Sequence, residues 1–188
     1  MPNWTSNRIY IEGDQADIRA FLEEVKWEDK IFDFNRIIPM PELLKHTGSG
    51  MCEIDGKKVK TWYIVKHAKY DPPQEEEVAR LFTPEEHAQL KIIGHCDWYS
   101  WSVANWGTKW NACHVEIDDA SIKYGCIEIT FETAWSAPTP VLIKMREMFP
   151  ALTFDCRWRH EDESPYPHSL DEEDGETIGA ILAKAGAA

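Results

Sequence analysis

Regular hydrophobic patterns at the two ends of the chain restrict its fold more than any other feature of the sequence. Residues 7–12 alternate, with Ile9 and Ile11 on one face, as in a half-buried strand. Apolar residues then recur at helical spacing, which predicts an amphipathic helix from residue 14 or 15 to about residue 26. Asp14 is the expected N-cap of this helix. The chain therefore begins with a strand followed by a helix.

The last third of the chain is equally regular. Alternation predicts strands at residues 113–118, 124–133 and 152–158. Between the last two, apolar side chains repeat every three or four residues, so we expect a helix that begins near Pro138 and ends before Pro150. The resulting order, βαββαβ, predicts an α+β, ferredoxin-like fold, in which two helices cover one face of a four-stranded antiparallel sheet.

The segment between these two regular parts is expected to form an inserted hairpin and helix subdomain. Residues 32–41 are expected to be extended, because two prolines stop a helix there. Residues 51–65 resemble a hairpin with Asp55-Gly56 at its turn. Residues 74–82 are expected to form a short acidic helix.

A second helix is expected directly after this acidic segment. Thr83 and Glu86 have the spacing of a capping box, and Gly94 is the expected stop. These expectations give three parts. They are a ferredoxin-like domain at residues 1–35 and 113–159, an inserted subdomain with a tryptophan-rich segment at residues 36–112, and an acidic C-terminal tail at residues 160–188.

The charge of the chain limits its partners. Its 188 residues include 20 Lys and Arg against 33 Asp and Glu, a net charge of −13, which argues against a surface that binds duplex DNA throughout. The acidic tail is either a solvated segment or a mimic of phosphate charges presented to a basic groove. No apolar run is long enough to span a membrane, and five scattered cysteines suit reduced thiols, so we expect a cytoplasmic protein with no membrane partner.

Three stretches of the sequence resemble a known family. They are the N-terminal Met-Pro-Asn-Trp, the Phe-Asn-Arg-Ile-Ile-Pro-Met-Pro run at residues 34–41, and the Asn-Trp-Gly-Thr-Lys-Trp-Asn-Ala run at residues 105–112. Together they resemble the YubB-type ferredoxin-like family of bacteriophages and conjugative plasmids, over residues 1 to about 158. The resemblance implies a ferredoxin-like domain of a mobile element inside a bacterial cell. It implies no reaction and no catalytic residue.

The densest aromatic segment, at residues 97–112, has two interpretations. Its large side chains either seal one end of the sheet or form a recognition surface, because Trp and Tyr serve as interface anchors and as platforms for base stacking. The candidate residues of this surface are Trp98, Tyr99, Trp101, Asn105, Trp106, Lys109, Trp110 and Asn111.

Motifs for metal binding and catalysis are weak. The pairs His95-Cys96 and Cys113-His114 lack the spacing of zinc ligands, and adjacent residues of a strand point to opposite faces. We therefore expect no metal site, no cofactor and no catalytic residue, and whether the chain is an enzyme stays open.

Two functions compete at this point. The favoured hypothesis is a non-enzymatic accessory protein that binds a host protein with a basic surface, as an acidic inhibitor or nucleic-acid mimic directed at a defence or nucleic-acid-handling complex. Its expected contacts are Glu75, Glu76, Glu77, Glu172, Glu173 and Asp174. The alternative is a single-stranded nucleic-acid-binding protein that uses the tryptophan-rich segment together with a hairpin of basic and aromatic residues, Lys57, Lys58, Lys60, Trp62, Tyr63 and Lys66. The sequence leaves the oligomeric state open.

Overall fold

The computed structural model describes residues 3–48, 52–54, 57–59, 63–68, 75–163 and 166–171. The chain divides into two compact units, Met1–Pro39 with Val103–Ala188, and Met40–Ser102. Within the described ranges, no helix has the length and apolar character needed to cross a membrane.

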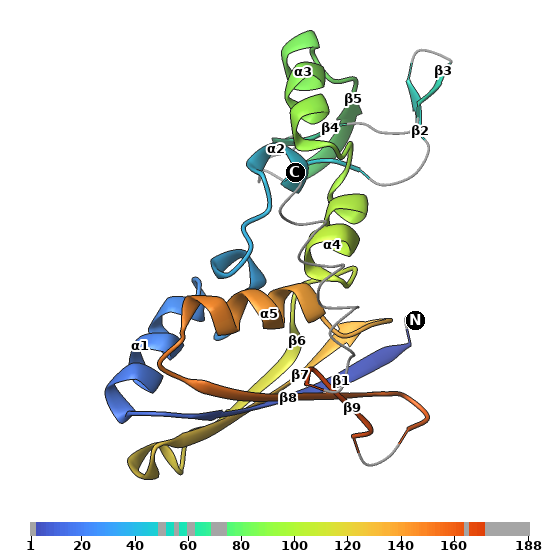
Figure 1. Ribbon diagram of the computed structural model, residues 1–188. Coiled ribbons are helices and arrows are strands. Elements are labelled where there is room, and N and C mark those ends of the chain that lie inside the picture. Colours follow the sequence, from blue (N-terminus) through green and yellow to red (C-terminus); the bar gives the residue numbers. More distant parts are fainter. Residues whose placement is uncertain are drawn as a thin grey trace. The chain divides into compact units, whose positions relative to one another are not determined.

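The first unit contains a five-stranded antiparallel sheet in the order β6-β7-β1-β8-β9 (Figure 1). Its strands are β1 (Trp4–Glu12), β6 (Cys113–Asp118), β7 (Cys126–Ala134), β8 (Thr153–His160) and β9 (His168–Ser169). Its helices are α1 (Gln15–Val25) and α5 (Thr139–Met148), with short 3-10 turns η1 (Phe34–Arg36) and η2 (Ile122–Tyr124). Without β9, the order is that of the split βαβ plan, so the expected α+β, ferredoxin-like fold is confirmed.

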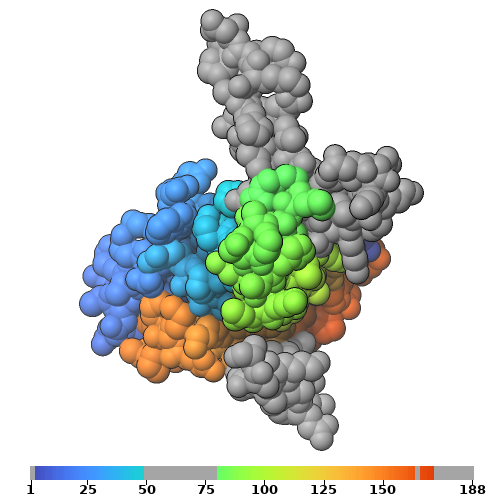
Figure 2. Space-filling model, turned by 90° about the horizontal axis from the view of Figure 1, so that it is seen from above, coloured from blue at the N-terminus to red at the C-terminus, as the bar shows by residue number. Residues whose placement is uncertain are grey.

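Both helices of this unit lie on one face of the sheet. Figure 1 shows α1 and α5 above the strands, and Figure 2, seen from the helix side, shows their blue and orange surfaces adjoining. The covered core contains Ile9 and Ile11 of β1, which are fully buried. Phe21 of α1 joins the two helices to the sheet, because its ring lies 5.0 Å from that of Phe149 and 5.7 Å from that of Phe154. Each such buried aromatic side chain contributes roughly 1.5–3 kcal/mol.

The β1–α1 connection depends on two glycines. The Gly13 amide donates a hydrogen bond of 3.0 Å to the Gly125 carbonyl. Gly125 has a φ of +81°, and a Cβ at that position would lie 2.8 Å from the Gly13 oxygen. Only glycine both adopts this positive φ without strain and lacks the Cβ that would clash with Gly13.

Residues 32–41 are not extended throughout, contrary to our expectation, because η1 lies within them. Asp33, which is buried, accepts hydrogen bonds from the Asn35 amide at 2.8 Å and from Asn111 Nδ2 at 2.6 Å. Asn111 Oδ1 in turn accepts from the amides of Phe34 and Ala112, both at 2.9 Å. Burial raises the pKa of Asp33, but hydrogen bonds from Asn111 and Asn35 outweigh it, so the pKa is lowered.

The segment after β8 remains part of this unit over residues 166–171. β9 pairs with β8 through Arg157–Ser169 and Trp158–His168, and Leu170 is 1% exposed. Asp171 forms an ion pair of 2.7 Å with Arg146 of α5. The sheet therefore continues past residue 159, where we expected the folded domain to end.

The second unit contains α2 (Glu42–Lys45), β2 (Cys52–Ile54), β3 (Lys57–Val59), β4 (Tyr63–Ala68), β5 (Glu75–Arg80) and α3 (Pro84–Ile93). α4 (Trp98–Trp106) begins in this unit and ends in the first. β2 and β3 pair antiparallel with Ile54 opposite Lys57, which confirms a hairpin; its expected turn, Asp55-Gly56, lies outside the described residues. The expected acidic helix at residues 74–82 is wrong, because β5 pairs with β4 from Glu75 to Arg80. Cross-strand pairing here overrides the local preference of a glutamate run.

The capping box of α3 is present as expected. The Glu86 amide donates to Thr83 Oγ1 at 3.2 Å, and the Thr83 amide donates to Glu86 Oε2 at 2.8 Å. Arg80 also donates two hydrogen bonds to the Glu86 carboxylate, at 2.7 and 2.8 Å. Chiefly because of Arg80, the pKa of Glu86 is lowered from 4.5 to about 2.

Replacing Asn111 tests the polar network around Asp33. We expect Asn111→Ala to lower the free energy of unfolding by about 2 kcal/mol, because it leaves the Phe34 amide and the Asp33 carboxylate short of a partner. Urea unfolding followed by circular dichroism measures this change. The matched control is Asn3→Ala, since the Asn3 side chain is exposed. Equal stability of the two variants would contradict the assigned role of Asn111.

Replacing Glu86 tests the capping box and its pH dependence. The pKa of Glu86 is lower in the folded state than in the unfolded state. The contribution of the Glu86 carboxylate to the stability of the fold is therefore fully present above about pH 4.5 and is lost as the pH falls toward 2. We expect Glu86→Gln to lower the free energy of unfolding at pH 7 by about 1 kcal/mol. Below pH 4.5, the free energy of unfolding of this variant should fall less steeply with pH than that of the unaltered chain. Denaturant unfolding as a function of pH measures both. Glu85→Gln, in the same helical turn, should change neither by a comparable amount.

Candidate functional site

The face of the sheet opposite α1 and α5, here called the open face, carries polar and charged side chains. Alternate residues of β1, from Trp4 to Glu12, point to it, while Thr5, Asn7, Ile9 and Ile11 point to the helices. The strand register places residues of neighbouring strands in rows across this face. The rows are Glu132–Ser6–Arg159, Glu116–Thr130–Arg8–Arg157 and Asp118–Glu128–Tyr10–Asp155.

The register places four acids on one half of the open face and its three arginines on the other half. Strands β6 and β7 contribute the acidic half, which consists of Glu116, Asp118, Glu128 and Glu132. Strands β1 and β8 contribute the other half, here called the basic half, which has Arg8, Arg157 and Arg159 together with the acids Glu12 and Asp155. Two ion pairs of 3.0 Å, Arg8–Glu128 and Arg157–Asp155, use part of this charge.

Tyr166 extends the basic half from the connection between β8 and β9. The guanidinium groups of Arg8 and Arg159 lie 5.9 and 5.4 Å from the centre of its ring, within the range of cation–π attraction. Nε of Arg159 is buried and makes no hydrogen bond within the described residues. The Tyr166 ring is therefore held at the sheet by two cations.

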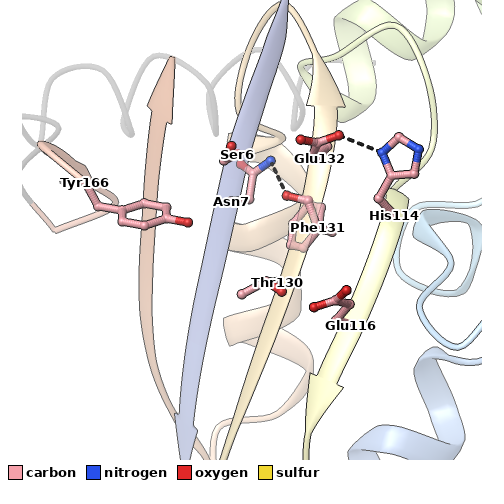
Figure 3. Close-up of a pocket in the computed structure, with 8 residues that line it drawn as sticks. All are labelled: Ser6, Asn7, His114, Glu116, Thr130, Phe131, Glu132 and Tyr166. Carbon is pink, nitrogen blue, oxygen red and sulfur yellow. Dashed lines mark hydrogen bonds and ion pairs between the residues drawn. The ribbon is translucent and has the colours of Figure 1, made fainter. Parts of the chain in front are cut away.

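A shallow hollow of about 360 Å³ lies in the open face. Figure 3 shows its lining: Tyr166 on one side, Ser6 and Asn7 on β1, Thr130, Phe131 and Glu132 on β7, and His114 and Glu116 on β6. The hydroxyl of Tyr166 points toward β1, and the Glu116 carboxylate lies at the opposite side. Within the described residues, the side chain of Glu116 makes no hydrogen bond or ion pair.

A β-bulge shapes the upper part of the hollow. The β6–β7 register shifts between Cys113 and Glu116, and His114 has a φ of +49°. This conformation, which costs a non-glycine residue about 1–3 kcal/mol, brings His114 Nδ1 to 2.6 Å from the Glu132 carboxylate. The bulge thus commits Glu132 to a histidine and leaves Glu116 available.

Next to His114 the sheet ends in a cluster that we call the tryptophan corner, which consists of Trp4, Lys109, Trp110, His114 and Trp135. The Trp4 ring lies 6.1 Å from Trp110 and 5.6 Å from His114. The ammonium group of Lys109 lies between two indoles, 4.7 Å from Trp110 and 4.9 Å from Trp135. Trp135 is 46% exposed and has a φ of +74°, so it is both accessible and held in an unfavourable backbone conformation.

The charge environment also affects Tyr10, at the centre of the open face. A hydrogen bond with Cys126, then burial, then the negative charges of Glu12 and Glu128 raise the pKa of Tyr10 to about 12. The surrounding groups therefore disfavour the ionised form of Tyr10.

One group of metal-binding residue types converges in the described part of the chain. His160, Glu163 and His168 offer ligand atoms that all lie within 4.8 Å of one another. They lie at the end of β8, in the following turn and at the start of β9.

The residues predicted from the tryptophan-rich segment differ in burial and in the groups that they contact. Trp101 and Trp106 are buried, and Trp106 donates a hydrogen bond of 2.8 Å to the Ile38 carbonyl. Trp98, Tyr99 and Asn105 of α4 are half-buried. Asn111 bonds to Asp33, whereas Lys109 and Trp110 reach the tryptophan corner.

The remaining predicted contacts are only partly described. Glu75, Glu76 and Glu77 lie on β5, Lys57 and Lys58 on β3, and Tyr63 and Lys66 on β4, in each case without described side chains. Lys60, Trp62, Glu172, Glu173 and Asp174 lie outside the described residues.

Sequence reasoning missed the open face. Its residues occupy the outward positions of the same strands that alternation predicted, so those positions were the available signal. They were interpreted as ordinary solvated surface, because only the register shows that the three arginines share one half of the face and four acids the other. The His160, Glu163 and His168 group was missed because the tail was expected to begin at residue 160.

Comparison with known proteins bears on the second half of the chain. Residues 105–180 match a family model described as "Ferredoxin-like domain in Api92-like protein". No curated protein and no solved structure matches the chain. The matched range includes β6, β7, α5, β8 and β9, and with them the acidic half of the open face, Trp110 and Trp135. A ferredoxin-like domain is thus supported by both the fold and the family model.

Proposed function

We propose that the protein is a non-enzymatic binding module whose open face holds a basic surface of a partner protein. The observation that carries this proposal is the Glu116 carboxylate, which lines the hollow and has no partner within the described residues. A lysine or arginine side chain of the partner would satisfy it, and Asp118 and Glu128 lie in the next row of the sheet.

The tryptophan corner supplies the apolar part of such an interface. Trp135 is exposed, and Trp110 and Trp4 lie beside it next to the hollow. Tryptophan anchors near charged side chains are typical of binding hot spots, where an aromatic residue contributes most of the affinity and charges set the orientation. The module therefore combines an anchor and a charge pattern within one sheet.

A finer form of the proposal concerns the partner. The resemblance to proteins of bacteriophages and conjugative plasmids, together with the net charge of −13, supports an accessory protein of a mobile element that inhibits a host defence or nucleic-acid-handling complex. Such complexes present basic grooves to nucleic acid. The acidic half of the open face would occupy a groove of this kind.

Charge reversal on β6 tests the proposed face. We expect Glu116→Lys combined with Asp118→Lys to weaken partner binding at least about tenfold, because two attractive contacts become repulsive. The measurement is affinity capture from a nuclease-treated bacterial lysate, followed by titration of each captured protein against both forms.

The control carries the same change of charge elsewhere. Glu28→Lys with Asp29→Lys alters the exposed turn after α1, which lines no part of the hollow. The control should retain the proteins that the unaltered chain captures, and the β6 variant should lose them. Equal capture by all three forms would remove the acidic half from the proposed interface.

Binding of single-stranded nucleic acid remains the second candidate, favoured by the other half of the face. Arg8 and Arg159 flank the ring of Tyr166, and Lys109 lies between two tryptophans, a combination of cations and stacking surfaces that suits unpaired bases. Three of the acidic side chains, Glu116, Glu128 and Glu132, face the same sheet surface and would repel phosphates.

A labelled single-stranded oligonucleotide separates the two candidates. We expect no change in its fluorescence anisotropy at physiological salt, because the open face carries more acids than arginines. The second candidate instead requires a salt-dependent increase that Trp135→Ala reduces. Observing that increase would replace the proposed protein partner by nucleic acid.

A further inference from the structure

Two imidazoles and one carboxylate converge on the helix-covered side of the sheet, away from the hollow. His160 is the last residue of β8, and His168 is the first residue of β9. Glu163 lies in the turn that follows β8 and accepts a hydrogen bond of 2.9 Å from the His160 amide. The three ligand atoms lie within 4.8 Å of one another.

Neighbouring residues orient both imidazoles. The His160 Nδ1 atom lies 3.2 Å from the hydroxyl of Thr5, which is fully buried. The His168 ring stacks on Trp158 at an interplanar angle of 19° and a centroid distance of 6.2 Å. Partners of this kind, which fix the orientation of a ligand ring, are typical of metal-binding histidines.

An ion pair alone accounts for only part of this arrangement. His168 Nε2 lies 2.9 and 3.1 Å from the two oxygens of Glu163, so these two residues already form a close pair. The His160 ring adds a second imidazole 5.4 Å from the His168 ring, which a simple ion pair does not require. Metal–ligand bonds of about 2.0–2.1 Å place the atoms of a tetrahedral set about 3.4 Å apart, so a small rotation of His160 would complete the site.

We propose that His160, Glu163 and His168 bind one Zn²⁺ ion. Two histidines and a carboxylate form a known three-ligand zinc set, which leaves a fourth position for water or for a group of a partner. The ion would fasten the connection between β8 and β9. Because Tyr166 lies in this connection, the ion would also fix the ring that flanks the hollow.

Titration with zinc chloride alone tests the site on the full chain. We expect isothermal calorimetry to show one Zn²⁺ per chain with micromolar or tighter affinity. His168→Ala and His160→Ala should each weaken this binding at least about tenfold, and Thr5→Val, which removes the hydroxyl beside His160, about tenfold. The matched control is His114→Ala, since His114 also pairs with a glutamate but lies on the open face; it should bind like the unaltered chain.

The absorption spectrum of the Co²⁺-substituted chain gives a second readout that does not depend on the variants folding. Nitrogen and oxygen ligands predict weak visible bands without the intense near-ultraviolet absorption of a cobalt–thiolate bond. The proposal is overturned if the unaltered chain binds no stoichiometric Zn²⁺, if thiolate absorption shows that cysteines hold the ion, or if folded His160 and His168 variants bind as tightly as the His114 control.

Discussion

β1 is paired with β7 from Trp4 to Glu12 on one side and with β8 from Thr5 to Glu12 on the other. The division of the sheet into a buried face and an open face depends on this register. It sends Ile9 and Ile11 to the helices and Arg8 to the open face, and a slip of one residue would exchange the two sets. The slip is further opposed by the buried Asn7 amide, which donates to Thr133 Oγ1 at 2.9 Å and would lose this partner.

The same register explains how a mildly acidic sheet acquires two distinct halves. Opposite residues on antiparallel strands share a face, so the acids of β6 and β7 gather together only because those strands are neighbours. The bulge at His114 then decides which acid gains a hydrogen-bond partner. It pairs Glu132 with His114 and leaves the Glu116 carboxylate at the hollow. The strained backbone of His114, which costs about 1–3 kcal/mol, therefore lies beside the hollow.

Local patterns predicted the helices and strands whose buried residues recur at a regular spacing within the element itself. Phe21 and Ile18 define α1, and Ile127 and Ile129 define β7, through spacing alone. β5 was predicted wrongly because its glutamates favour a helix in isolation, whereas its pairing with β4 depends on residues about ten positions away. The open face was not predicted from the sequence for the same reason. Arg159 and Glu132 are 27 positions apart in the sequence, and only the strand order shows that they share a row.

The connection between β8 and β9 contributes residues both to the hollow of the open face and to the proposed zinc site. It carries Glu163, which accepts a hydrogen bond from the His160 amide, and Tyr166, whose ring lies close to the guanidinium groups of Arg8 and Arg159. An ion held by His160, Glu163 and His168 would restrict this connection, so a partner that needs the Tyr166 ring in place would bind the ion-loaded chain more tightly. Linkage is reciprocal, so that partner would strengthen ion binding by the same factor. A partner that contacts only the acidic half would leave ion binding unchanged, which separates the roles of the two halves of the open face.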